Sequence, residues 1–381
     1  MAGPLSGVKI IELTGIGPGP FAAMLLSDMG AEVIRVDRAQ WVGQDQAPSA
    51  VQVLDRGRRS IAVDLKRPEG VETVLRLADS ADALIEGYRP GVAERLGIGP
   101  EVCLARNPRL VYGRMTGWGQ DGPLAHAAGH DINYIALAGA LAHFGRKGTK
   151  PTPPINLIGD FGGGGMFLAF GVVCAVLEAR SSGQGQVVDA AMVDGTATLM
   201  SMIWGVRAVG GWNEELGTNF LDTGGPTYDT YETADHKFIS LGSLEPQFYA
   251  EFLERTGLAN DPDLPHPRDH DRIEELRARF TALFASKTRD EWCALLEGTD
   301  VCFAPVLPMS EAAQHPHIRA RGTIVEHDGI LQPAPAPRFS RTPGEIGRPP
   351  STPGEHTDEI LREAGFSASE IAELREAGAV A

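Results

Sequence analysis

The sequence of 381 residues is poor in cysteine, with four residues that lie far apart and show no Cys-x-x-Cys spacing. Disulfide-rich secreted domains and zinc modules need clustered cysteines, so this distribution argues against both classes. The four are Cys103, Cys174, Cys293 and Cys302. Isolated cysteines are typical of reduced thiols in an intracellular enzyme. We therefore expect a cytoplasmic protein without a bound metal.

Positive charge is also scarce, since 34 lysines and arginines face 50 aspartates and glutamates and leave a formal net charge of −16. Such a chain repels nucleic acids and anionic membranes, and we expect neither as a partner. The longest apolar run, residues 166–177, has 12 residues, whereas a spanning helix needs about 20. We see no charged leader followed by an apolar segment at the start and no peroxisomal Ser-Lys-Leu at the end.

What the sequence does contain, in its first 120 residues, is an alternation of strand and helix patterns. Short aliphatic runs predict strands at residues 8–13, 31–36, 60–63, 83–86 and 110–114 and, further along, at 187–190. Helical patterns lie at residues 20–29, 69–78, 101–106, 130–143, 161–179 and 193–209. This alternation predicts an α/β fold with a parallel sheet flanked by helices.

The pattern changes after Gly210. A hairpin at residues 227–232 and 237–241, helices at 247–256, 272–285 and 289–296, and a strand at 302–306 predict a smaller α+β domain. Two charged helices at 355–364 and 367–377 follow, the second opened by the capping box Ser367-x-x-Glu370. We predict a large α/β domain over residues 1–200, a linker over 201–224, a small domain over 225–325, and a segment over 326–381 that returns to the large domain.

The loop Gly15-Ile-Gly-Pro-Gly-Pro20 follows the first strand and invites comparison with a dinucleotide-binding turn. Asp37 lies 20 residues after Gly17, where such sites place an acid that binds ribose. Pro20, however, stands where the fingerprint requires a glycine, and neither Pro18 nor Pro20 offers an amide to a pyrophosphate. We therefore favour a tight turn between a strand and a helix.

Basic residues gather at or beside the ends of the predicted strands, despite the acidic composition. They are Arg35, Arg38, Arg56, Arg58, Arg59, Arg89 and Arg95. Open α/β sheets bind ligands at the carboxyl ends of their strands, so the group suits a phosphorylated ligand such as a nucleotide or coenzyme A. Each residue taken singly also suits a solvated surface cation, and both interpretations stay open.

Two glycine-flanked turns carry residues suited to acid–base chemistry. Gly129-His-Asp-Ile-Asn-Tyr134 places His130 at the first turn of a helix, and Asp160 precedes four glycines in residues 156–165. An imidazole and a carboxyl are both suitable proton acceptors. Each also has a plain structural interpretation, because His130 can simply start its helix and Asp160 can cap the next one.

Together these segments resemble the alpha-methylacyl-CoA racemases of the family III CoA-transferase superfamily, over nearly the whole chain. The opening Gly7-Val-Lys-Ile-Ile-Glu-Leu13 and the block Gly185-Gln-Val-Val-Asp189 are marks of the superfamily. The racemase branch is marked by Gly129-His-Asp-Ile-Asn-Tyr134 and Glu245-Pro-Gln-Phe-Tyr249. The chain departs from the pattern in an insertion near residues 40–50 and in residues 223–228 and 241–245, which bear on acyl-chain preference.

The resemblance implies a Rossmann-like large domain, a small domain, and an interlocked homodimer with the active site between subunits. It assigns His130 and Asp160 as the two catalytic bases, and the partner subunit's Glu245 as the support of His130. The implied contacts of the coenzyme A thioester are Arg38, Val63, Asp64, Leu65, Lys66, Arg95, Gly129, His130, Asp131, Ile132, Asn133 and Tyr134. No cofactor is implied, because coenzyme A is part of the substrate, and the setting is fatty-acid metabolism.

The implied reaction interconverts (2R)- and (2S)-2-methylacyl-CoA through an enolate. One base removes the α-proton while the other delivers a proton to the opposite face, and amides at His130 and Asp131 bind the thioester oxygen. The main alternative is a family III CoA-transferase in which Asp160 is the nucleophile and forms an acyl anhydride. A catalytically silent module that binds coenzyme A or a nucleotide is a third possibility.

Overall fold

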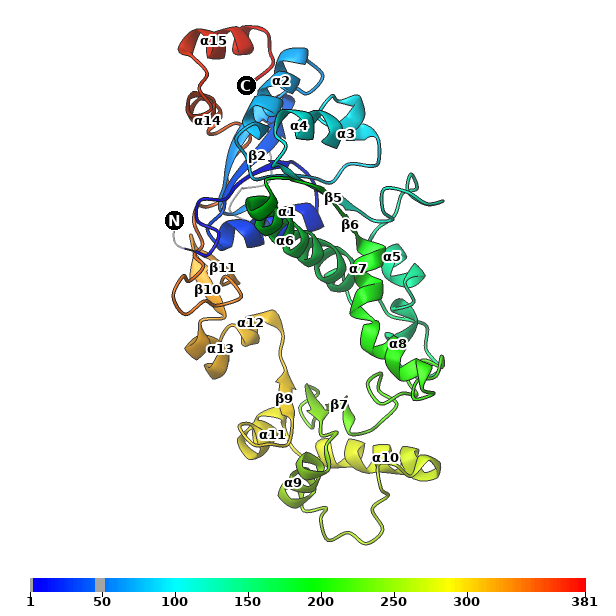
Figure 1. Cartoon of the computed structure of the whole chain (residues 1–381). Helices are drawn as coiled ribbons and strands as arrows, with labels where there is room; N and C mark the ends of the chain where they lie inside the picture. Colours follow the sequence, from blue (N-terminus) through cyan, green and yellow to red (C-terminus); the bar gives the residue numbers. More distant parts are fainter. Residues whose placement is uncertain (1–2, 45–51) are drawn as a thin grey trace. The chain divides into compact units, whose positions relative to one another are not determined.

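The computed structural model describes residues 3–44 and 52–381, so residues 45–50 of the insertion predicted near 40–50 lie outside the described residues. The chain forms two compact units (Figure 1). The first contains the residues up to 138 together with 154–201 and 322–381, and the second contains 139–153 and 202–321. The C-terminal segment thus belongs to the same unit as the N-terminal part.

A six-stranded parallel sheet, in the order β3-β2-β1-β4-β5-β6, forms the centre of the first unit. Its strands are β1 (Lys9–Leu13), β2 (Glu32–Arg38), β3 (Arg58–Val63), β4 (Ala83–Glu86), β5 (Val111–Thr116) and β6 (Val187–Ala191). Ile11 of β1 pairs with Ile34 of β2 and Leu84 of β4, and all three are buried. Buried aliphatic residues made these strands recognisable in the sequence, although charged residues such as Glu12 of β1 and Arg58 of β3 are buried among them. The predicted α/β fold is confirmed.

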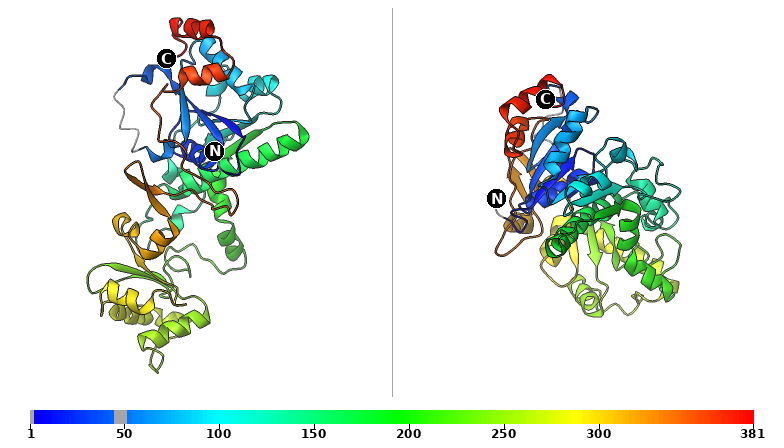
Figure 2. Two further views of the ribbon diagram at one scale, coloured as in Figure 1. Left: turned by 90° about the vertical axis from the view of Figure 1, so that its left-hand side faces the viewer. Right: turned by 45° about the horizontal axis from the view of Figure 1, so that its top comes forward.

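Helices cover both faces of this sheet (Figures 1 and 2). On one face lie α1 (Pro18–Asp28) and α6 (Met166–Ser182). On the other lie α2 (Pro68–Ala78), α4 (Pro100–Arg106), α14 (Thr357–Glu363) and α15 (Ala368–Glu376). Val380 forms a bridge with Val63 of β3, so the C-terminal segment packs against the N-terminal strands. The Ser367 hydroxyl accepts the Glu370 amide N–H, which confirms the predicted capping box.

Three of the helices expected between residues 130 and 209 differ from prediction. The helix expected over 130–143 is α5 (Asp131–Leu137) followed by a 3₁₀ turn, and that expected over 193–209 is α7 (Met192–Leu199) and α8 (Ser201–Ala208). The helix expected over 161–179 begins earlier, because the π-helix Leu157–Gly165 continues into α6. The combined helix has 26 residues, enough by length and composition to cross a membrane, contrary to our expectation from the short apolar run. Six side chains of α6 are nonetheless buried, and they lie in the core on the sheet.

The second unit has an antiparallel sheet of β7 (Tyr228–Glu232), β8 (Phe238–Gly242) and β9 (Phe303–Val306). Helices α9 (Pro246–Thr256), α10 (Ile273–Phe284) and α11 (Arg289–Leu296) contribute Phe252, Phe280, Phe284 and Trp292 to its core. The predicted hairpin and helices are confirmed. Short helices α12 (Met309–Ala312) and α13 (Pro316–Arg321) follow. The hairpin of β10 (Ile324–His327) and β11 (Ile330–Pro333) then opens the C-terminal part of the first unit.

Candidate active site

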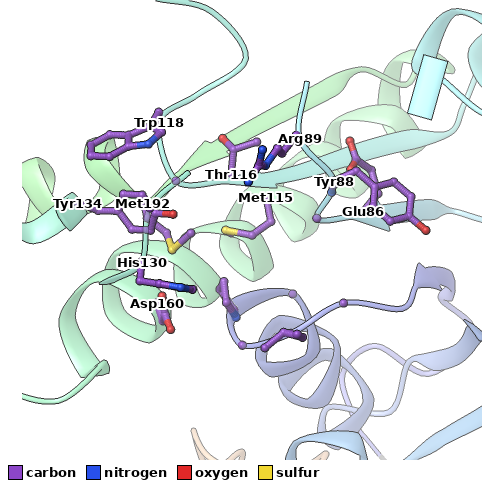
Figure 3. A pocket seen from close by; sticks show the side chains of 18 of the residues that line it. Glu86, Tyr88, Arg89, Met115, Thr116, Trp118, His130, Tyr134, Asp160 and Met192 are labelled. Atoms are coloured by element: carbon purple, nitrogen blue, oxygen red, sulfur yellow. Dashed lines mark hydrogen bonds between the residues drawn. The ribbon is translucent and has the colours of Figure 1, made fainter. Parts of the chain in front are cut away.

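A cavity of about 370 Å³ opens at the carboxyl ends of β1, β4 and β5 in the first unit. The loops that follow these strands form its wall together with the start of α5 and the π-helix (Figure 3). The side chains in the wall include Tyr88, Arg89, Met115, Thr116, Trp118, His130, Tyr134, Asp160 and Met192. The two predicted bases therefore line a single cavity.

His130 immediately precedes α5 and has an extended backbone, with φ −133° and ψ 174°. Its amide N–H donates to Asn133 Oδ1 at 3.0 Å, which fixes the start of the helix. The imidazole is exposed and lies beside Asp160 (Figure 3). Of the two amides predicted to bind the thioester oxygen, that of His130 is thus already engaged. That of Asp131 has no partner in the described part of the chain.

The segment before His130 needs glycine because two aromatic rings pack against it. A Cβ at Gly129 would lie 2.7 Å from the Tyr134 ring and 3.0 Å from the Trp118 ring. The two rings meet edge to face, with centroids 4.7 Å apart. Gly117 is closer still, since a Cβ there would lie 2.1 Å from Tyr134. These contacts hold the His130 segment against the loop after β5.

Asp160 lies half-buried in the π-helix, and its Oδ2 accepts a hydrogen bond from Asn156 Nδ2 at 3.0 Å. Burial raises the pKa of the Asp160 carboxyl, and the negative charge of Asp131 raises it further. The Asn156 hydrogen bond and the nearby His130 act in the opposite direction without cancelling the rise. The carboxyl therefore keeps its proton to a higher pH than an ordinary aspartate, as a proton donor requires.

Four successive glycines let the π-helix pack directly on α7. A Cβ at Gly163 would lie 2.7 Å from the Thr196 amide nitrogen, and a Cβ at Gly195 would lie 1.8 Å from the Gly163 carbonyl oxygen. No side chain fits at either position without a shift of the backbone. The segment that carries Asp160 is therefore held by contact between two helix backbones. Insertions of π-helix are rare and occur often at functional sites.

A second cavity, of about 310 Å³, lies at the carboxyl ends of β2 and β3. Its lining includes five of the residues predicted to contact coenzyme A: Arg38, Val63, Asp64, Leu65 and Lys66. The Arg38 guanidinium lies over the Trp41 ring, 5.1 Å from the centroid. Tyr88 lines both cavities, so the two are neighbours within the first unit.

The other predicted residues fall into three groups. Arg95 ends the short helix α3 (Val92–Arg95), whose Val92 lines the second cavity. Gly129 and Tyr134 line the first cavity, whereas Asp131, Ile132 and Asn133 lie in the first turn of α5 outside its lining. Glu245 is an exposed residue of the second unit that precedes α9, and its side chain makes no capping hydrogen bond within the described chain.

The phosphate interpretation is wrong for four members of the basic group, because their side chains form ion pairs inside the first unit. Arg35 pairs with Asp37 at 2.8 Å, Arg56 with Asp28 at 2.6 Å, Arg58 with Glu12 at 2.9 Å, and Arg59 contacts Glu32, Glu359 and Glu363. Buried guanidinium groups need such partners, and an acidic chain supplies them. Arg38, Arg89 and Arg95 remain beside the carboxyl ends of strands.

Sequence reasoning gave no individual role to Tyr88, Trp118 or Asn156. Tyr88 and Trp118 line the same cavity as the predicted bases, and Asn156 donates a hydrogen bond to Asp160. For Tyr88 and Trp118 a signal existed, since both follow strands whose carboxyl ends meet at the same edge of the sheet. For Asn156 no spacing rule was available. Within residues 3–44 and 52–381, no group of three His, Cys, Asp or Glu side chains is placed to hold a metal ion.

Comparison with known proteins agrees with this architecture. The sequence model of CoA-transferase family III matches residues 5–357, and the chain belongs to that family. Alpha-methylacyl-CoA racemase of Mus musculus is 47% identical over 373 residues, which cover 97% of this chain and 96% of the mouse protein. The racemase of Homo sapiens is 44% identical with the same coverage. The resemblance found in the motifs is therefore confirmed.

The fold also occurs in solved structures. The crystal structure of a CaiB/BaiF family protein from Brucella suis matches with a TM-score of 0.82 and 24% sequence identity, over 96% of this chain and 100% of that chain.

Proposed function

We propose that this chain is a racemase that interconverts (2R)- and (2S)-2-methylacyl-CoA thioesters by proton transfer at C2. The observation that carries the proposal is that His130 and Asp160, from separate segments, line one cavity at the carboxyl ends of the sheet. The two relatives named alpha-methylacyl-CoA racemase support the substrate class. Coenzyme A is part of the substrate, and the proposed reaction uses no cofactor.

In one direction the neutral His130 imidazole removes the α-proton, and the protonated Asp160 carboxyl delivers a proton to the opposite face of C2. In the other direction the two exchange roles. The raised pKa of Asp160 supports its part as a donor. The Asp131 amide adjoins His130 of the cavity wall and has no partner in the described chain, and it is the proposed donor to the thioester oxygen as negative charge develops in the enolate. One such donor is typically worth about 3–4 kcal/mol.

The coenzyme A part of the substrate is proposed to occupy the second cavity, where Arg38 and Lys66 offer positive charge to its phosphates. In the proposed cytoplasmic homodimer, the partner subunit's Glu245 orients the His130 imidazole. A row of exposed apolar side chains on α6, which includes Phe170 and Leu177 at 68% and 71% exposure, supports an assembly that buries this face. Fatty-acid metabolism is the proposed setting, without a membrane or a nucleic acid as partner.

The decisive test is incubation of (2R)-2-methylacyl-CoA with the enzyme in deuterium oxide. Appearance of the 2S epimer with deuterium at C2 supports the racemase. The alternative function is favoured by the family itself: Asp160 attacks the thioester carbonyl, forms an anhydride and releases coenzyme A as the thiol. It predicts transfer of coenzyme A to an added carboxylic acid, with release of the 2-methyl acid and without label at C2. If neither product forms, the chain is a binding module without catalytic activity.

A further inference from the structure

One buried carboxylate beside the candidate active site has no part in the reaction proposed above. Asp131 is 6% exposed, and its Oδ2 accepts two backbone amides of the π-helix, that of Gly159 at 2.6 Å and that of Asp160 at 2.8 Å. Its second oxygen, Oδ1, is buried without a hydrogen-bond partner among the described residues. No arginine or lysine of the described residues forms an ion pair with it, in contrast to two buried acids of the sheet, Glu12 and Glu86.

This arrangement joins the two catalytic segments. Asp131 follows His130 in the chain, and its side chain binds the backbone of the other base. The contact is tight, because a Cβ at Gly159 would lie 2.6 Å from Asp131 Oδ2. Two amide donors and the first turn of α5 stabilise the negative charge of the carboxylate. That charge then lies next to the Asp160 carboxyl.

We propose that Asp131 is a positioning residue, which ties the Asp160 segment to the His130 segment and by its negative charge favours the protonated form of Asp160. The proposal rests on the racemase function above and deepens it. A neutral amide at position 131 also accepts two N–H groups, so anchoring alone does not require a carboxylate. Aspartate differs from asparagine here by its negative charge, and this charge disfavours ionisation of the neighbouring Asp160 carboxyl.

Few other titratable or polar groups face Asp160. They are His130 just before α5, Tyr134 of α5, and the neutral Asn156 just before the π-helix. The residues of α1 and α7 that touch the π-helix, such as Phe21 and Thr196, are neutral. Asp194 of α7 is exposed, Asp189 of β6 accepts the Gln120 amide, and Arg114 of β5 pairs with Glu86 and Glu94. Arg89 lines the same cavity.

The test is the dependence of kcat/KM for deuterium exchange at C2 on pH, measured for wild type, Asp131→Asn and Asp131→Ala. A two-base racemase needs one proton on the pair, so the acid limb reports loss of the first proton. Asp131→Asn removes the charge and keeps an acceptor, and we expect the acid limb to move about 1 pH unit lower. Asp131→Ala also removes the anchor, and we expect kcat to fall about 10- to 100-fold.

The matched control is Asp194→Asn, which removes one exposed acid from α7, the helix that packs on the π-helix, and should leave the acid limb unchanged. Should Asp131→Asn fail to fold by circular dichroism, Asp131→Ser supplies an uncharged acceptor in its place. An acid limb that stays where it is in the wild type overturns the electrostatic role, and wild-type kcat in Asp131→Ala overturns the anchoring role. A wild type without label at C2 would instead contradict the racemase function itself, so the two failures are distinguishable.

Discussion

His130 and Asp160 reach one cavity from segments that are built in opposite ways. His130 stands exposed at the start of a short α-helix, where aromatic rings pack on the glycine before it. Asp160 is half-buried within a π-helix whose backbone lies against α7. Solvent reaches the first base, whereas burial raises the pKa of the second, the Asp160 carboxyl. The contrast suits a reaction that needs a proton acceptor and a proton donor at the same pH.

The largest effect should follow from removal of either base. His130→Ala and Asp160→Ala should each lower racemisation by about 10²- to 10⁴-fold, because proton removal and proton delivery are both required. Chiral chromatography of the product measures this, and circular dichroism and gel filtration check that fold and assembly persist. Turnover near the wild-type rate in either variant would contradict the assignment of that residue as one of the two bases.

The next prediction concerns the exposed base, His130, and its proposed support by Glu245 across a dimer. Two inactive variants, His130→Ala and Glu245→Ala, should then complement each other in a hybrid dimer isolated with two tags. One site of the hybrid holds both residues, which predicts about half of the wild-type activity. The two mutant homodimers are the controls. A hybrid no more active than either parent would show that the residues act within one chain or that Glu245 has no part in the site.

The buried side is sensitive to packing. Gly195→Ala places a Cβ 1.8 Å from the Gly163 carbonyl oxygen, so the π-helix must shift, at a cost of about 1–3 kcal/mol in free energy of unfolding. Gly205→Ala in α8 is the matched control, since no described atom outside its own helix backbone and its chain neighbours lies within 4 Å of the new Cβ. It should be neutral or stabilise by up to about 1 kcal/mol. Thermal unfolding followed by circular dichroism compares them, and equal midpoints would refute the close packing inferred here.

A change outside both segments should alter binding alone. Arg38→Ala removes a cation from the second cavity, and we expect KM for the acyl-CoA to rise about 10-fold with a smaller effect on kcat. Arg109→Ala, an exposed arginine before the amino end of β5, is the control and should keep the wild-type KM. A defect confined to kcat would remove Arg38 from the coenzyme A site.

Hydrophobic pattern was sufficient to predict the sheet and most helices, because strands such as β1 and β4 contain consecutive buried aliphatic residues. It did not reveal the π-helix, since four glycines weaken any helical pattern and the contact with α7 decides the geometry. The break between α7 and α8 at Met200 has no glycine or proline to announce it. Helices and strands could thus be predicted where one pattern of buried residues runs through the whole element. They were harder to predict where contacts with another element determine the geometry.

The candidate site was predictable only in part. His130 and Asp160 were noticeable as polar residues beside glycines. The motifs of the racemase branch favoured a catalytic role for them over a purely structural role at the start of a helix. The phosphate interpretation was wrong for four arginines, because a sequence does not show which acid will lie beside a given arginine in the fold. Arg59 contacts Glu359 and Glu363, 300 and 304 residues away. The same holds for Asp131, whose amide partners lie across a gap of 28 and 29 residues that includes part of the second unit.

The smallest expected effect tests whether the raised pKa of Asp160 has a cost in stability. A carboxyl whose pKa is higher in the folded protein than its ordinary value of 3.8 favours folding most at low pH, and this contribution is lost as pH rises through the folded value. Asp160→Asn lacks the ionisation, so at pH 7 its Tm should exceed that of the wild type, by roughly 2 °C. The difference should shrink as the pH falls toward 4. Calorimetry at several pH values measures this difference. A lower Tm for Asp160→Asn than for the wild type at pH 7 would show that ionisation of the half-buried Asp160 carboxyl does not destabilise the fold.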